Sequence, residues 1–89
     1  MLSAEVKIVN KLGLHARAAA KLVNLASSYE AEIELERDGK RVNGKSIMSV
    51  MMLAASQGTT LRLHVDGSDE REAFDGVVDL INDYFGEGE

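Results

Sequence analysis

Cysteine is absent from this 89-residue sequence, and only two histidines, His15 and His64, are present. The chain therefore has no disulfide framework and no thiolate metal site, and we expect no bound metal. Basic residues are in the minority, with ten against fifteen acidic residues and a net charge of −5. Non-specific binding to nucleic acid needs a basic surface, so we expect no nucleic-acid partner.

Long apolar runs are also missing. No stretch approaches the length of a membrane-spanning helix, and the N-terminus lacks the basic and apolar regions of a signal peptide. We therefore expect a cytoplasmic protein that does not insert into membranes. Hydrophobic residues make up 45% of the chain and charged residues 28%, which is the balance of a folded globule. We expect residues 1–89 to form a single monomeric domain with its functional site on the surface.

Alternation of apolar and polar residues predicts four strands, over residues 5–9, 31–36, 40–42 and 60–65. Asp38 and Gly39 are typical of the tight turn of a hairpin that joins the second and third strands. The glutamates of the second strand form one outward row, at positions 32, 34 and 36. We interpret this row as a solvated sheet face that meets Lys and Arg across the strands, rather than as a metal site, because same-face positions diverge too far to enclose an ion. His64 is expected on the solvent face of the fourth strand.

A spacing of three and four residues predicts three helices. The first begins at Ala16, ends at Ser27 and Ser28, and places Arg17, Lys21 and Asn24 on its solvent side. Its apolar stripe consists of Ala19, Leu22, Val23 and Ala26. The second helix is expected over residues 47–54, capped by Ser46, with Val50, Leu53 and Ala54 toward the core.

The third helix is expected to follow Ser68 as its cap, with acidic residues in its first turn. Its predicted stripe consists of Ala73, Val77, Leu80, Ile81 and Tyr84. Residues 86–89 are expected to form a frayed tail without a further element. The order β-α-β-β-α-β-α predicts an α+β fold, most simply one four-stranded antiparallel sheet with all three helices on one face. The pattern leaves the strand order open, and a ferredoxin-like order is compatible with the first six elements.

The segment from Gly13 to Arg17 places a histidine where a glycine turn leads into a helix. Amides at a helix N-terminus have no internal partners and favour anions such as phosphate. A neutral imidazole is a nucleophile, and Arg17 is able to neutralise phosphoryl oxygens. By itself the segment favours a polar residue that merely starts a helix over a phosphorylatable histidine, by roughly three to one.

The second predicted helix has more apolar residues than one buried face requires. Ile47, Met48 and either Met51 or Met52 are left over once its core positions are assigned. Two interpretations stay open here, a helix buried nearly all round and an adaptable surface for protein partners.

Three separated motifs resemble the histidine-containing phosphocarrier (HPr) family of the bacterial phosphotransferase system. They are NKLGLHAR at residues 10–17, GKSIM at residues 44–48 and QG at residues 57–58, and the order of elements between them corresponds along nearly the whole chain. The resemblance implies an open-faced β-sandwich. It also implies that His15 accepts a phosphoryl group on Nδ1 from phosphorylated enzyme I and passes it to a type IIA protein.

The same resemblance implies roles for further residues and no bound cofactor. Arg17 stabilises the phosphoryl group, and Ser46 is the residue that an HPr kinase/phosphorylase modifies in organisms that possess one. The expected partner-binding residues are Ala20, Lys21, Asn24, Lys45, Ile47, Met48 and Met51. The chain is a relay in this interpretation, not an autonomous enzyme.

One residue departs from the family pattern, because Ala18 stands where the family usually has proline. Alanine is a strong helix former, so we expect the helix to survive, although the loss of proline bears on how rigidly the phosphate site is held. Residues 10–13, residues 51–53 and the acidic end after Phe85 resemble the nitrogen-related (NPr) branch more than the sugar-transport branch.

Two other functional classes remain as alternatives. A regulatory module that binds partners through the methionine-rich helix, without phosphate turnover, would share the same surface. A small metal- or nucleotide-binding domain is disfavoured by the absence of cysteines and of a phosphate-loop glycine pattern.

Overall fold

Strands and helices follow one another in the predicted order. The computed structural model describes residues 1–88. Its strands are β1 (Leu2–Lys7), β2 (Glu32–Arg37), β3 (Lys40–Asn43) and β4 (Thr60–Asp66), and its helices are α1 (Ala16–Ser27), α2 (Ile47–Met51) and α3 (Glu70–Asn82). The first strand thus lies earlier than predicted, because its pairing with β4 begins at Leu2 and ends at Lys7.

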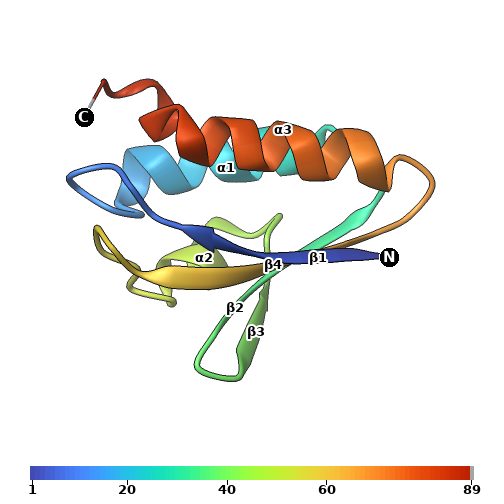
Figure 1. Ribbon diagram of the computed structural model, residues 1–89, viewed down its shortest axis with the longest axis horizontal. Coiled ribbons are helices and arrows are strands. Elements are labelled where there is room, and N and C mark those ends of the chain that lie inside the picture. Colours follow the sequence, from blue (N-terminus) through green and yellow to red (C-terminus); the bar gives the residue numbers. More distant parts are fainter. Residues whose placement is uncertain (89) are drawn as a thin grey trace.

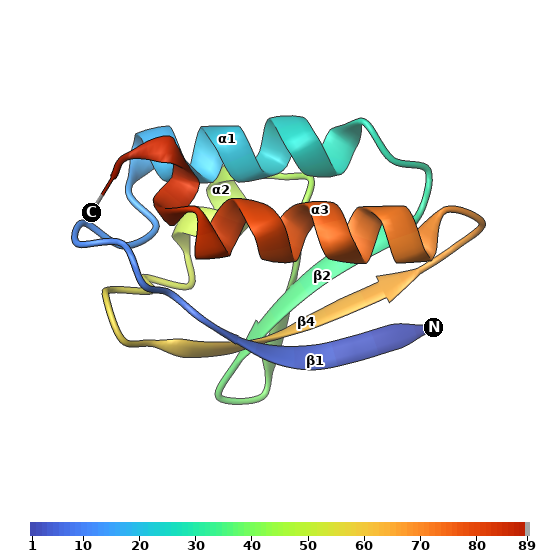
Figure 2. The ribbon, with the colours of Figure 1, turned by 45° about the horizontal axis from the view of Figure 1, so that its top comes forward.

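The strands form one antiparallel sheet in the order β1-β4-β2-β3. Helices α1 and α3 lie side by side over one face of this sheet, and α2 packs against α1 and β3 (Figure 1; Figure 2). In the part of the chain that the structure describes, residues 1–88, no helix lies over the opposite sheet face in either view. The predicted open-faced sandwich is confirmed.

The core lies between the sheet and the helices because each element turns its apolar residues inward. Every residue of the predicted α1 stripe is buried, and Ala18 is buried with it. Inward side chains of the central strands, such as Leu35, Leu63 and Val65, are completely covered. Burying one such side chain contributes about 1.5–3 kcal/mol, so this layer supplies most of the stability.

The hairpin between β2 and β3 forms at the predicted turn. Asp38 and Gly39 have φ values of 52° and 83°, the pair of left-handed conformations that a type I′ turn requires. The turn fixes the register, which pairs Arg37 with Lys40 and places the buried Val42 opposite Leu35.

The outward glutamates of β2 lie on the open sheet face. Glu34 accepts a hydrogen bond from Arg41 at 2.6 Å, and Glu36 lies 2.7 Å from Nε2 of His64. Glu32 instead lies opposite Asp66 in the sheet register. The row is therefore a charged sheet face, as predicted, although the side chain of His64 is only 13% exposed between its neighbours.

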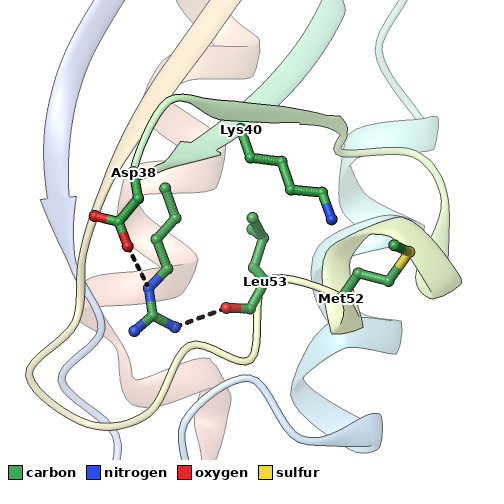
Figure 3. Close-up of a pocket in the computed structure, with 5 residues that line it drawn as sticks. Asp38, Lys40, Met52 and Leu53 are labelled. Carbon is green, nitrogen blue, oxygen red and sulfur yellow. Dashed lines mark hydrogen bonds and ion pairs between the residues drawn. The ribbon is translucent and has the colours of Figure 1, made fainter.

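Helix α2 ends three residues before the predicted boundary. Ala54 was expected to face the core, but it is exposed and has a φ of 50°, while Ala55 is buried in its place. Arg37 donates hydrogen bonds to the carbonyls of Leu53 and Ala54 at 2.7 and 3.0 Å, across a shallow hollow between α2 and the hairpin (Figure 3). These bonds satisfy two carbonyls in the turn that follows α2.

The N-cap of α3 is Asp69, one residue after the predicted Ser68. Asp69 occupies the N-cap position, and its carboxylate accepts the backbone N–H groups of Glu30 and Ala31 at 2.9 and 2.8 Å. Ser68 instead donates to the Glu30 side chain at 3.3 Å. The cap residue thus stabilises the start of β2 rather than its own helix.

The C-terminal segment departs most from the prediction of a frayed tail. After α3 the chain forms a 3-10 turn, Tyr84–Gly86, in which Phe85 is completely buried and Tyr84 is 39% exposed. The prediction that Tyr84 faces the core is therefore wrong, because the helical period ends before this residue. Glu89 lies outside the described residues. Within residues 1–88, no helix is both long and apolar enough to cross a membrane.

Candidate functional site

His15 lies immediately before α1, at its N-cap position. Its backbone is extended, with φ −72° and ψ 176°, and its carbonyl accepts the N–H of Ala19 at 2.9 Å. The imidazole makes no capping hydrogen bond to the first amides of the helix. Those amides therefore stay available for an anion beside a side chain that is 29% exposed.

Gly13 sets the path of the chain into this helix. Its φ is 68°, and a Cβ at this position would lie 2.5 Å from the Ala55 carbonyl oxygen, so only glycine fits. The same carbonyl accepts the N–H of Leu14 at 2.8 Å. Ala55, which follows α2, is therefore fixed beside the start of α1.

A carboxylate from the C-terminal segment reaches the histidine. Glu87 contacts Nε2 of His15 through one oxygen, and its other oxygen accepts a hydrogen bond from Asn10 at 2.9 Å. Asn10 is completely buried and also donates to the Gly13 carbonyl at 2.8 Å. Hydrogen bonding from Asn10, and next from His15, holds the pKa of Glu87 below its ordinary value although partial burial opposes this shift.

A basic pocket of about 430 Å³ adjoins this contact. It is lined by Lys11, Leu12, Arg17, Lys21, Gly86 and Glu87. Three of these side chains are cationic, so the pocket favours an anion even though the whole chain is acidic. The pocket and His15 share Glu87 as a neighbour.

The predicted surface residues of α1 lie where the helical spacing placed them. Arg17, Lys21 and Asn24 are exposed, and Ala20 is partly exposed between them. Lys21 also donates a hydrogen bond to the Phe85 carbonyl at 2.7 Å, so its ammonium helps to hold the C-terminal turn. Among residues 1–88, no carboxylate forms an ion pair with Arg17.

Helix α2 exposes an apolar patch that resolves the two interpretations of its sequence. Met48 is 77% exposed, whereas Val50 is completely buried. The patch, which we call the methionine surface, comprises Ile47, Met48, Met51 and Met52. Clustered exposed methionines provide a deformable contact area, so this helix has one buried side and one open side.

Ser46 and Lys45 lie at the other end of α2 from His15. The Ser46 hydroxyl accepts the N–H of Ser49 at 3.3 Å, which confirms the predicted cap. Lys45 donates to the Tyr29 carbonyl at 2.7 Å, just beyond the C-terminus of α1. The structure therefore groups Arg17 and Lys21 with His15, and groups Lys45 with the far end of the methionine surface.

Comparison with known proteins agrees with this geometry. Residues 2–83 match the family described as PTS HPr component phosphorylation site. The chain belongs to the HPr family. It is 54% identical over 89 residues to the phosphocarrier protein HPr of Neisseria meningitidis serogroup A, and 53% identical over 90 residues to that of Pseudomonas aeruginosa, with both chains completely covered in each case. These matches support the predicted phosphocarrier function within the phosphotransferase system.

Solved HPr structures share the fold. A crystal structure of HPr from Thermoanaerobacter tengcongensis superposes with a TM-score of 0.94 at 48% identity, covering 98% of each chain. A second structure from that organism, described as an HPr dimer, gives a TM-score of 0.79 at the same identity and covers 98% of this chain and 100% of that one. Our expectation of a monomer stays a prediction for this HPr-family chain.

Sequence reasoning missed two residues that contact or support His15. Asn10 enters the sequence analysis only within the segments that carry the family resemblance, and Glu87 only within the acidic tail, neither with a role at His15. The position of Asn10, a small polar residue directly after a strand-like pattern, weakly indicates a structural role. No neighbouring residue in the sequence indicates a role for Glu87. Its contact with His15 spans 72 residues of chain.

Proposed function

We propose that His15 is the residue through which this HPr-family chain carries a phosphoryl group. It accepts the group from phosphorylated enzyme I and passes it to a type IIA protein. The observation that carries this proposal is the position of His15, a partly exposed imidazole at the start of a helix whose first amides are not capped by its side chain. His64 is nearly enclosed on the sheet face and adjoins no helix N-terminus.

The groups around His15 suit an incoming phosphoryl group. The helix amides donate hydrogen bonds to its oxygens, and the guanidinium of Arg17 neutralises the charge that develops on them. Ala18 keeps an N–H where proline would have none, but the residue is completely buried, so we do not count this amide among the phosphoryl donors. Enzyme I and the IIA protein supply the remaining groups, so this relay needs neither an enclosed pocket nor a cofactor.

The methionine surface and the exposed side of α1 form the docking area in this proposal. Met51 and Met52 follow one another at the end of α2 that is fixed beside Leu14, so apolar contacts continue toward the histidine. Lys21 and Asn24 on α1, with Lys45 beyond the other end of α2, provide a polar margin. Ala20 leaves room for a close approach along α1.

We also propose that Ser46 is a regulatory phosphorylation site where an HPr kinase/phosphorylase exists. Its hydroxyl already caps α2, and a phosphate there would lie at a helix N-terminus, where negative charge is tolerated. The acidic C-terminal end and residues 10–13 further favour a nitrogen-related role over sugar transport. Residues 1–89 act as one cytoplasmic domain in this proposal.

Incubation with enzyme I and phosphoenolpyruvate, followed by mass spectrometry under conditions that preserve phosphohistidine, tests the proposed function. The chain should gain one phosphoryl group and lose it again when a cognate IIA protein is added. A regulatory binding module would bind enzyme I without gaining phosphate. That result, obtained with enzyme I that phosphorylates a reference HPr, would contradict the relay.

A further inference from the structure

The C-terminal segment is held against the His15 site by specific contacts. Phe85 is completely buried, and Lys21 donates to its carbonyl at 2.7 Å. Tyr84 and Phe85 both adopt left-handed backbone conformations, with φ values of 58° and 53°. Such conformations are uncommon for bulky residues and persist only where packing enforces them. The turn therefore has a fixed shape that returns Glu87 toward α1.

Glu87 is held on both of its oxygens. One oxygen contacts Nε2 of His15, and the other accepts from Asn10, whose side chain is completely buried. Asn10 is in turn fixed by its second hydrogen bond, to the Gly13 carbonyl. The carboxylate side chain is only 14% exposed. A buried amide thus orients the carboxylate, and the carboxylate orients the imidazole.

The charge state of Glu87 determines which ring nitrogen is protonated. Hydrogen bonds from Asn10 and His15 lower its pKa, so near neutral pH the group is a carboxylate and can only accept. Nε2 of His15 must therefore be the donor in their contact. In a neutral imidazole the proton on Nε2 leaves the lone pair on Nδ1.

We propose that Glu87, oriented by Asn10, is a positioning residue for phosphoryl transfer at His15: it holds the Nε2–H tautomer and stabilises the ring after Nδ1 is phosphorylated. This inference rests on the proposed function of His15. Glu87 itself does not touch the transferred group, because it binds the other ring nitrogen. The logic is that of a carboxylate that fixes the tautomer of a reacting histidine.

The transfer step shows why the carboxylate favours the product. The Nδ1 lone pair forms a bond to phosphorus while the bond between phosphorus and the donor atom of enzyme I breaks, and that atom keeps the bonding pair. The Nε2 proton stays in place, so the phosphorylated ring is formally an imidazolium. Its N–H group then forms a charge-assisted hydrogen bond to Glu87, which is stronger than the bond to the neutral ring. Passing the group to a IIA protein reverses these changes.

The opposite role for the same contact is a gate, in which Glu87 repels the incoming phosphate. The arrangement of charges disfavours it. Arg17, Lys11 and Lys21 line the pocket next to Glu87, so the carboxylate is not the dominant charge at the site. Removing Glu87 distinguishes the two roles, because a gate predicts faster phosphorylation and a positioning residue predicts slower phosphorylation.

The first test needs no phosphoryl transfer. Nitrogen-15 chemical shifts of His15 are compared in the wild type, Glu87→Ala, Glu87→Gln and Glu72→Gln, where Glu72 is an exposed α3 residue that controls for lost charge. We expect the Nε2–H tautomer alone in the wild type and the control. The Nδ1–H form should appear in Glu87→Ala and should be weaker in Glu87→Gln, whose amide oxygen is still able to accept. Identical spectra for all four proteins would overturn the proposal.

The second test measures phosphorylation by enzyme I at limiting phosphoenolpyruvate. Glu87→Ala should show a rate lower by about tenfold and a transfer equilibrium shifted against the phosphorylated chain by a similar factor, the effect expected for loss of one charged hydrogen bond. Glu87→Gln should keep most of the rate but share the equilibrium shift. Unchanged or faster phosphorylation of Glu87→Ala would overturn the proposal. Failure of the wild type to accept phosphate would contradict the proposed function instead, and the nitrogen spectra would still test the contact.

Discussion

His15 and His64 make nearly the same local contact in two different regions of the molecule. Each directs Nε2 at a glutamate, Glu87 in one case and Glu36 in the other. His64 lies on the open sheet face, where the carboxylate comes from the neighbouring strand β2. His15 lies at the start of α1, with a basic pocket and the methionine surface close by. A histidine paired with a carboxylate therefore does not by itself indicate a phosphoryl-transfer site. The helix amides and the cations beside His15 distinguish it from His64.

Removing each histidine in turn should produce the largest difference between the two sites. His15→Ala should abolish phosphoryl acceptance from enzyme I with little effect on the fold, because the side chain is partly exposed and lies outside the apolar core. His64→Ala should accept phosphate at the wild-type rate. Phosphorylation of both variants is measured by mass spectrometry, with circular dichroism to verify folding. Acceptance by the His15 variant combined with loss in the His64 variant would reverse the assignment.

The next largest effect concerns the arginine near each histidine. Arg17→Ala should slow phosphorylation by about a hundredfold, the usual cost of losing one donor that stabilises developing charge. Arg62→Ala, which removes a cation from the sheet face beside Ser3, should leave the rate unchanged. Single-turnover kinetics with phosphorylated enzyme I would measure both. Equal effects from the two arginines would indicate general electrostatic attraction rather than a role at the site.

The fold around both histidines was largely predictable, because it depends on patterns repeated along each element. Strand alternation placed His64 outward, and helical spacing placed Arg17 and Lys21 on the open side of α1. The predicted helix ends and caps were wrong where contacts with residues distant in sequence determine the local structure. Ala54, just beyond α2, has a left-handed φ of 50°, and Arg37 binds the carbonyls at 53 and 54. The carboxylate of Asp69 binds the backbone just before β2 and makes no capping hydrogen bond to its own helix.

The site was predictable only in the part that is continuous in sequence. Gly13 to Arg17 gives the turn, the histidine and the helix start within five positions, whereas Asn10 acts through burial and Glu87 through a return of the chain. A few residues after a helix contain too little periodicity to predict such a return. The buried Phe85 directs it, and the sequence shows that residue only as an aromatic near the end.

The methionine surface should separate docking from folding. Met48→Asp should weaken binding to enzyme I strongly while changing the free energy of unfolding by under about 1 kcal/mol, because Met48 is 77% exposed. Ser3→Asp, which adds the same charge to the exposed N-terminal strand, is the matched control and should bind normally. Titration calorimetry and urea unfolding report the two quantities. A loss of several kcal/mol of stability in Met48→Asp would place this residue in the core.

A smaller, salt-dependent effect is expected at Ser46. Ser46→Asp keeps a side chain that caps α2, so the fold should hold. Its new charge lies beside Lys45 and the methionine surface and should slow the encounter with an acidic patch on enzyme I. Raising the ionic strength should restore part of the His15 phosphorylation rate, because salt screens exposed charges. An unchanged rate at low salt, in a folded variant, would leave Ser46 as a helix cap alone.

The most direct test of the central claim is to locate the phosphoryl group on the atom that carries it. The chain is labelled with nitrogen-15 histidine, phosphorylated by enzyme I and phosphoenolpyruvate, and examined for phosphorus–nitrogen coupling at a pH that preserves phosphohistidine. We expect one coupled nitrogen, Nδ1 of His15, with both nitrogens of His64 uncoupled. Coupling at His64, or at Nε2 of His15, would contradict this expectation.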